Sequence, residues 1–96
     1  MEQIAELTEE NFARMLRRDR RERFIAGVFE SGEDVASLRA FVGVTQVEFA
    51  AALGISVHTL RGWEQGRRRP EGPALALLRI AARHPQFIRE NLQVAA

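Results

Sequence analysis

Residues 45–70, TQVEFAAALGISVHTLRGWEQGRRRP, decide the fold of this 96-residue chain. Thr45, followed three residues later by a glutamate, has the spacing of a capping box and predicts a helix over residues 46–53. Gly54 can supply a left-handed turn, and Ser56 can cap a second helix directly after it. Two short helices joined by such a turn predict a helix-turn-helix.

One face of the second helix is expected to pack against the core, and the opposite face has no role in the core. Ile55, Leu60 and Trp63 are spaced to hold the helix against the core. A helix held in this way can enter the major groove of DNA and present side chains to the base edges. The face without a core role carries the candidates for base contact, which are Val57, His58, Arg61 and Gly62.

Capping residues and helix breakers mark further helices on both sides of the motif. Asp34 is predicted to cap the preceding helix, over residues 35–42. Pro73 and Pro85 each suit the first turn of a later helix. Because no stretch shows the alternation of a strand, we expect an all-α fold with a five-helix domain over residues 34–96.

Residues 1–33 form the other part of the expected organisation, a helical N-terminal segment. This segment carries more apolar side chains than an exposed tail normally does. They are candidates for binding a toxin or packing a dimer, with extra DNA contact as an alternative. A membrane surface is disfavoured because the acidic start would be repelled by anionic lipid. The candidates are Phe12, Met15, Leu16, Phe24, Ile25 and Phe29.

The formal net charge of +1 conceals two basic clusters, and every one of the 14 basic residues is arginine. Residues 14–23 form the first cluster, which a solvated helix face would explain equally well. Residues 61–69 form the second, at the end of the second motif helix and just beyond it. Polyanion binding depends on local fields more than on total charge, so the near-neutral sum does not exclude a nucleic-acid partner.

The sequence offers nothing for catalysis. The chain has no cysteine, and its two histidines, His58 and His84, are far apart, so we expect no metal site. No histidine–acid pair is placed to activate a nucleophile, and no glycine-rich phosphate loop occurs. We therefore expect no enzyme, no cofactor and no small-molecule substrate. Without a leader or an apolar run of ~20 residues, a cytoplasmic location is expected.

At the motif, the sequence resembles the Cro/repressor-type (XRE) helix-turn-helix family. The resemblance is carried by Thr45-Gln46, Phe49-Ala50, Leu53-Gly54-Ile55-Ser56, Thr59-Leu60, Trp63-Glu64, Gly66 and Arg67-Arg68-Arg69-Pro70. It implies base contacts from Val57, His58, Arg61 and Gly62, and a structural ion pair between Arg39 and Glu64. It also implies contacts to DNA phosphates from Gln46, Thr59, Arg67, Arg68 and Arg69.

The stretch WEQGRRRPEGPALALLRIAARHP, residues 63–85, together with the short segment ahead of the motif, resembles the HigA-like antitoxins, including the NadS-type regulators. This resemblance implies a homodimer that binds double-stranded operator DNA and represses its own operon. It also implies a RelE/HigB-type ribonuclease toxin as a partner. Two alternatives stay open: a free-standing transcriptional repressor, and a protein-interaction module that no longer binds DNA.

Overall fold

The computed structural model describes residues 16–95, with the side chains of residues 16–92. Within this part the regular structure is all helical, as predicted, and six helices follow one another. They are α3 (Arg18–Ile25), α4 (Gly32–Val42), α5 (Gln46–Leu53), α6 (Val57–Glu64), α7 (Pro73–Arg83) and α8 (Pro85–Ala95).

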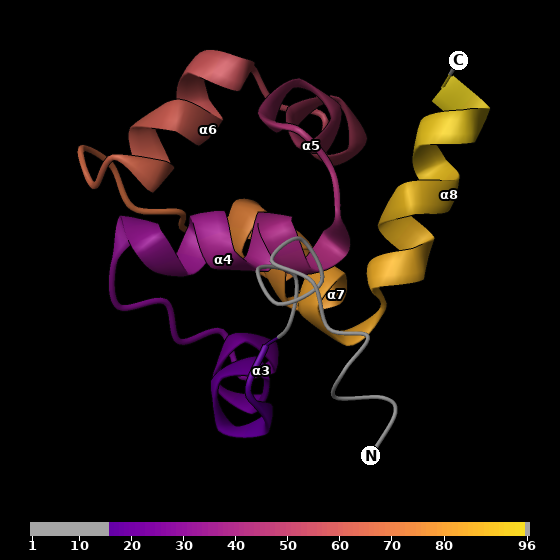
Figure 1. The fold of residues 1–96 in the computed structure, drawn as a ribbon. Coiled ribbons are helices and arrows are strands. Elements are labelled where there is room, and N and C mark those ends of the chain that lie inside the picture. Colours follow the sequence, from indigo (N-terminus) through magenta and orange to yellow (C-terminus); the bar gives the residue numbers. More distant parts are fainter. Residues whose placement is uncertain (1–15, 96) are drawn as a thin grey trace, which may run out of the picture.

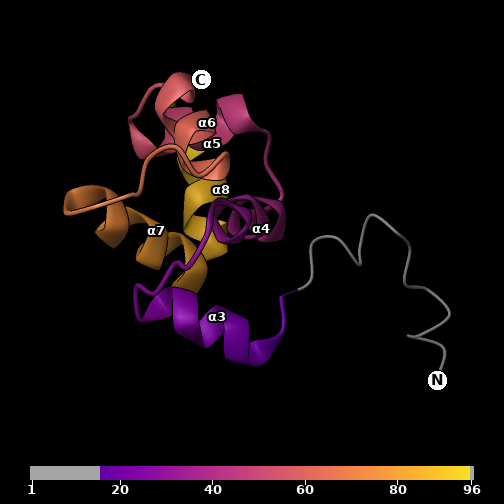
Figure 2. The same ribbon diagram turned by 90° about the vertical axis from the view of Figure 1, so that its left-hand side faces the viewer.

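Helices α4 and α7 lie in the middle of the molecule, between α5 and α6 at one end and α3 at the other (Figure 1). The view turned by 90° shows the same order, with α8 running from α7 toward α5 (Figure 2). Each helix contributes to one core of apolar side chains that are at most 6% exposed. These include Phe24, Leu38, Phe49, Leu60, Leu78 and Ile88, one from each helix in chain order.

The two motif helices begin where the local sequence predicts. The Thr45 hydroxyl accepts a hydrogen bond from the Glu48 N–H at 3.1 Å, and the Glu48 carboxylate accepts one from the Thr45 N–H at 2.9 Å. The Ser56 hydroxyl caps α6 by accepting from the Thr59 N–H at 3.0 Å. Gly54 turns the chain between them with a φ of 72°. Each such cap stabilises its helix by about 1 kcal/mol.

The start of α4 corrects the prediction that Asp34 caps a helix over residues 35–42. The helix begins at Gly32, and Asp34 lies inside its first turn. A Cβ atom on Gly32 would lie 2.3 Å from the carbonyl oxygen of Glu64 and 2.6 Å from that of Trp63. Glycine therefore lets the first turn of α4 touch the backbone of the last turn of α6.

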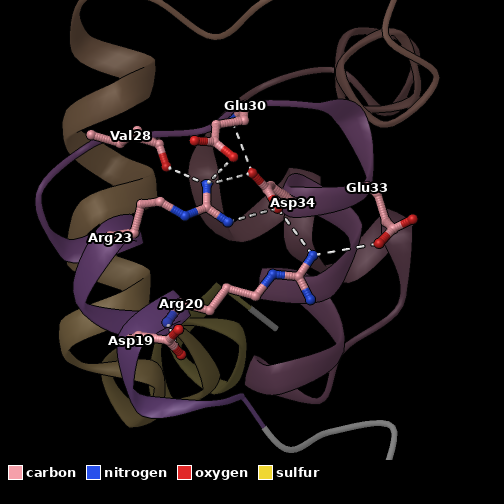
Figure 3. Close-up of polar contacts among 7 residues, drawn as sticks. All are labelled: Asp19, Arg20, Arg23, Val28, Glu30, Glu33 and Asp34. Atoms are coloured by element: carbon pink, nitrogen blue, oxygen red, sulfur yellow. Dashed lines mark hydrogen bonds and ion pairs between the residues drawn. The ribbon is translucent and has the colours of Figure 1, made fainter.

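Asp34 joins α4 to α3 through ion pairs around its buried carboxylate (Figure 3). Its side chain is 5% exposed and accepts from Arg20 at 3.0 Å, from Arg23 at 2.8 Å and from the backbone N–H of Glu30 at 2.8 Å. Burial favours the neutral acid, but the bonds from Arg23, Glu30 and Arg20 prevail and lower the pKa of Asp34 from 3.8 to about 2. Part of the first arginine cluster is therefore structural.

Helices α3 and α7 cap each other's carboxyl ends. The Arg21 guanidinium, from α3, donates to the carbonyl oxygen of Ala82 at 2.9 Å. In the other direction, the Arg79 guanidinium, from α7, donates to the carbonyl oxygen of Ile25 at 2.9 Å. The last carbonyls of a helix lack partners within it, and a cation there also interacts favourably with the helix dipole. The two helices are thus joined by polar contacts as well as by the core.

Helix α8 likewise donates hydrogen bonds to carbonyl oxygens near the carboxyl ends of α4 and α5. Arg89 donates to the carbonyl oxygen of Val42 at the end of α4, and Asn91 donates to that of Ala52 near the end of α5. Because these donors come from distant parts of the chain, the carboxyl ends of α4 and α5 are both tied to α8.

The described helices are short, with at most 11 residues each. No single one of them is long and apolar enough to cross a membrane. Helices α4 and α5 reach the necessary length and composition only as a pair, which is bent by 91° between them.

The contact of Gly32 with the α6 backbone predicts that Gly32→Ala destabilises the protein. Overpacking of this kind costs about 1–3 kcal/mol, since carbonyl atoms cannot rotate away. Gly62→Ala is the matched control, because a Cβ there would meet only the Arg68 side chain, at 3.7 Å. An alanine within α6 should raise stability by about 0.5–1 kcal/mol. Urea denaturation measures both variants; equal effects would contradict the close contact.

The low pKa of Asp34 predicts a stability loss in acid. Its folded-state pKa of about 2 lies below its ordinary 3.8, so the stabilisation is complete above about pH 5 and is lost as pH falls toward 2. The expected loss is about 2 kcal/mol. Asp34→Asn should remove this part of the pH dependence in urea titrations. Glu33→Gln, whose carboxylate is 82% exposed and also near Arg20, should retain it.

Candidate nucleic-acid interface

Helix α6 is held by one face and leaves the other free. Leu60 is fully buried and Trp63 is 5% exposed, and the helix packs on α4 and α5. His58 and Arg61, on the other side of the helix, are exposed. The sequence folds in this way locally because the Ser56 cap fixes where the helix starts, and thereby which side chains face the core.

An ion pair anchors the end of α6. The Arg39 guanidinium, from α4, donates to the two carboxylate oxygens of Glu64 at 2.7 and 3.2 Å. The Glu64 side chain is only 7% exposed. Arg39 also donates to the carbonyl oxygen of Val44, in the connection between α4 and α5, at 3.2 Å. A bidentate pair with little access to water fixes the orientation of both side chains.

Gln46 extends this contact to the exposed face of α6. Its Nε2 donates to Glu64 Oε1 at 2.9 Å, and its Oε1 accepts from Arg61 Nε at 3.1 Å. A series of side-chain hydrogen bonds therefore runs from the edge of the core to the surface, through Arg39, Glu64, Gln46 and Arg61. An amide group carries two N–H bonds, so Gln46 retains one donor besides that used by Glu64.

The four candidates for base contact do not share one environment. His58 and Arg61 are exposed, and Val57 is partly buried against the core. Gly62 is buried, with the stem of Arg68 over the position of its missing side chain. A contact of Gly62 itself with a base therefore stays a prediction, and the Arg68 stem lies between this position and the solvent.

The candidates for phosphate contact lie around α6. Thr59 is partly buried, and its hydroxyl accepts from that of Ser56 at 2.9 Å. Arg67, Arg68 and Arg69 are all exposed in the loop that follows α6. The Arg67 guanidinium donates to the side chain of Gln65.

Among the candidates for partner contact, Phe12 and Met15 lie outside the described residues. Phe24 is fully buried, which corrects the expectation that it faces a partner, and Phe29 stacks on it with ring centroids 4.7 Å apart. Leu16 and Ile25 are partly buried and line one surface hollow together with Phe41. The described members of this group thus serve the core at least in part.

The sequence interpretation missed the structural arginines of α3 and their acceptors. The local sequence around Asp34 favours a helix cap, but the Asp34 carboxylate bonds to side chains 11 and 14 residues away. The only signal in the sequence is that Arg20 and Arg23 are three residues apart, which places both on one face of a helix. In the part of the chain that the structure describes, no group of three or more histidine or acidic side chains could hold a metal ion.

Glu64→Gln tests the anchoring ion pair. Removal of the charge leaves Arg39 poorly paired in a site that is only 22% exposed, and breaking a buried pair costs about 3–5 kcal/mol. We expect the free energy of unfolding, measured by urea denaturation, to fall by about 3 kcal/mol. Glu22→Gln is the control, because its pair with Arg18 is long, at 3.9 Å, and exposed. A Glu64→Gln protein as stable as this control would show that the pair does not anchor α6.

Comparison with known proteins agrees with this geometry. The sequence profile of the helix-turn-helix domain family matches residues 11–85. The chain is also similar to Antitoxin HigA-2 of Vibrio cholerae serotype O1, with 39% identity over 58 residues, or 60% of this chain. The aligned region covers 56% of that relative, about half of its length. No solved structure matches the chain. The chain therefore belongs to the helix-turn-helix domain family, of the Cro/repressor (XRE) type.

Proposed function

We propose that this protein is a sequence-specific transcriptional regulator that binds operator DNA through α6. The observation that carries this proposal is the series of side-chain hydrogen bonds that links Arg39 to Arg61. It holds the exposed face of α6 in one orientation. A base-reading helix needs such support, because side chains that are already ordered lose less entropy on binding. This is a binding role and not an enzymatic one.

In this role, Val57, His58 and Arg61 contact the bases. The N-terminal turns of a recognition helix reach the base edges in the major groove, and these three residues lie there. The second N–H of Gln46 is free to donate to a phosphate oxygen. The Gln46 amide that would bind a DNA phosphate also orients the Arg61 side chain. Contact with the DNA backbone at Gln46 would thus help to place Arg61 against the bases.

Phosphate contacts come from Gln46, Thr59 and the loop after α6. Arg67 and Arg69 are exposed there, beyond the carboxyl end of the helix. The guanidinium group suits this task because its planar fork can bind two phosphate oxygens at once. These contacts fix the register on the duplex and carry no base preference of their own.

We further propose that the protein is a homodimer and acts as the antitoxin that represses its own operon. The similarity to Antitoxin HigA-2 supports this more specific role. Residues 1–33 are then the segment that binds a RelE/HigB-type toxin or packs the dimer, and residues 34–96 the part that binds DNA. A free-standing repressor is the alternative within the same family.

Titration of the protein with the DNA upstream of its own gene tests the regulator role. A dimer that neutralises about six phosphates should bind with a slope of log K against log salt near −5, and footprinting should protect two half-sites about 34 Å apart. Arg67→Ala should weaken binding to all sequences and make the slope shallower by about 2 per dimer. A slope near zero, or no protected site, would refute the proposal.

The antitoxin role has a separate test, which uses the adjacent gene. If that gene encodes a small ribonuclease, its product should arrest growth alone and be neutralised when this protein is co-expressed. The two should also co-purify as a complex. Specific operator binding without any toxic neighbour would leave a free-standing repressor as the function.

A further inference from the structure

Gly62 is a helix residue whose side-chain position is covered by another part of the chain. A Cβ atom there would lie 3.7 Å from Cδ and 3.8 Å from Cγ of Arg68, with no other described side chain within 4 Å. The aliphatic stem of Arg68 therefore lies directly over Gly62. Because Gly62 follows His58 by four residues, this stem lies on the helix face that also carries His58.

The backbone of the loop fixes this placement. The N–H groups of Arg67 and Arg68 both donate to the carbonyl oxygen of Gly62, at 2.9 and 3.3 Å. The same residue thus holds the loop by its backbone and receives the Arg68 stem on its surface. The Arg68 side chain therefore lies against α6 at Gly62.

Among the described residues, the Arg68 guanidinium differs from most other arginines because it has no hydrogen bond or ion pair with any of them. Arg39 is paired with Glu64, Arg61 with Gln46, and Arg67 with Gln65. The Arg68 side chain forms no hydrogen bond or ion pair with any residue that the structure describes, and it is exposed. Its stem packs on Gly62, and none of its five N–H donors is used by a residue that the structure describes.

We propose that Arg68 is a specificity-determining residue that reads a guanine in place of a side chain at position 62. Its stem starts in the loop but runs over the recognition helix where a long residue 62 would project. An arginine held there can donate two bonds to O6 and N7 of guanine, the commonest specific base contact. This assignment deepens the proposed function and rests on it.

The two neighbouring arginines have no such placement, which makes them matched controls. Arg67 is held by Gln65, and Arg69 lies beside a hollow that Arg68 and Trp63 also line, but it does not lie over Gly62. A purely electrostatic role would make all three arginines equivalent, since they have the same charge and are close in sequence. A base-reading role would separate Arg68 from the other two.

The test is selection of binding sites from a randomised duplex pool by the full-length protein, followed by affinity measurements on single-base variants of the selected site. The wild type should prefer guanine at one position in each half-site by about 10-fold or more. Arg68→Ala and Arg68→Lys should lose this preference and retain the others, because lysine supplies charge without the planar fork. Arg67→Ala and Arg69→Ala should weaken binding while every base preference persists.

Gly62→Leu provides an independent arm, since it keeps the arginine but fills the space of its stem. It should lose the same guanine preference as Arg68→Ala, while circular dichroism and thermal unfolding show a folded protein. A uniform loss of affinity with Arg68→Ala, or an intact preference in Gly62→Leu, would overturn the role of Arg68 alone. Failure of the wild type to select any sequence would instead overturn the proposed function.

Discussion

The ion pair between Arg39 and Glu64 is the interaction on which the arrangement of α4, α5 and α6 depends. One carboxylate at the end of α6 accepts bonds from α4 and, through Gln46, from the first residue of α5. If Arg39 moved away, the buried carboxylate of Glu64 would lose its charged partner, which is costly in a site with little water. The angle between the two motif helices is thereby fixed from inside the fold. Gly32 adds to this arrangement because its lack of a side chain lets α4 touch the α6 backbone.

The use of arginine without lysine has a structural explanation over much of the chain. Arg21, Arg79 and Arg89 each bind carbonyl oxygens at the end of a helix other than their own, and Arg20 and Arg23 share the buried Asp34. A guanidinium can serve several acceptors in one plane, whereas an ammonium group is a compact and strongly hydrated charge. In a small domain with short helices, many helix ends lie near the surface and need partners. Arginine stems cover apolar surface while their ends supply those partners.

Features that depend on neighbours in sequence could be predicted, and those that depend on distant partners could not. The caps at Thr45 and Ser56 join groups three residues apart, so their spacing is visible in the sequence. Asp34 has an equally suggestive local setting, but its partners are on α3, and only the packing of α3 against the rest of the chain reveals them. Helical periodicity places Gly62 on the free face of α6, yet a loop side chain covers it. The pairing of Arg39 with Glu64, 25 residues apart, came only from family resemblance.

The reciprocal caps between α3 and α7 have a consequence for how the molecule opens. If α3 detached alone, its own last carbonyl would lose Arg79, and the end of α7 would lose Arg21 in the same event. Phe24 would also leave a hole in the core. Local unfolding that begins at α3 or at the end of α7 is therefore costly from its first step. Each of these helices supplies the hydrogen-bond partner for a terminal carbonyl of the other. The two helices form a single cooperative unit, although 47 residues separate the end of one from the start of the other.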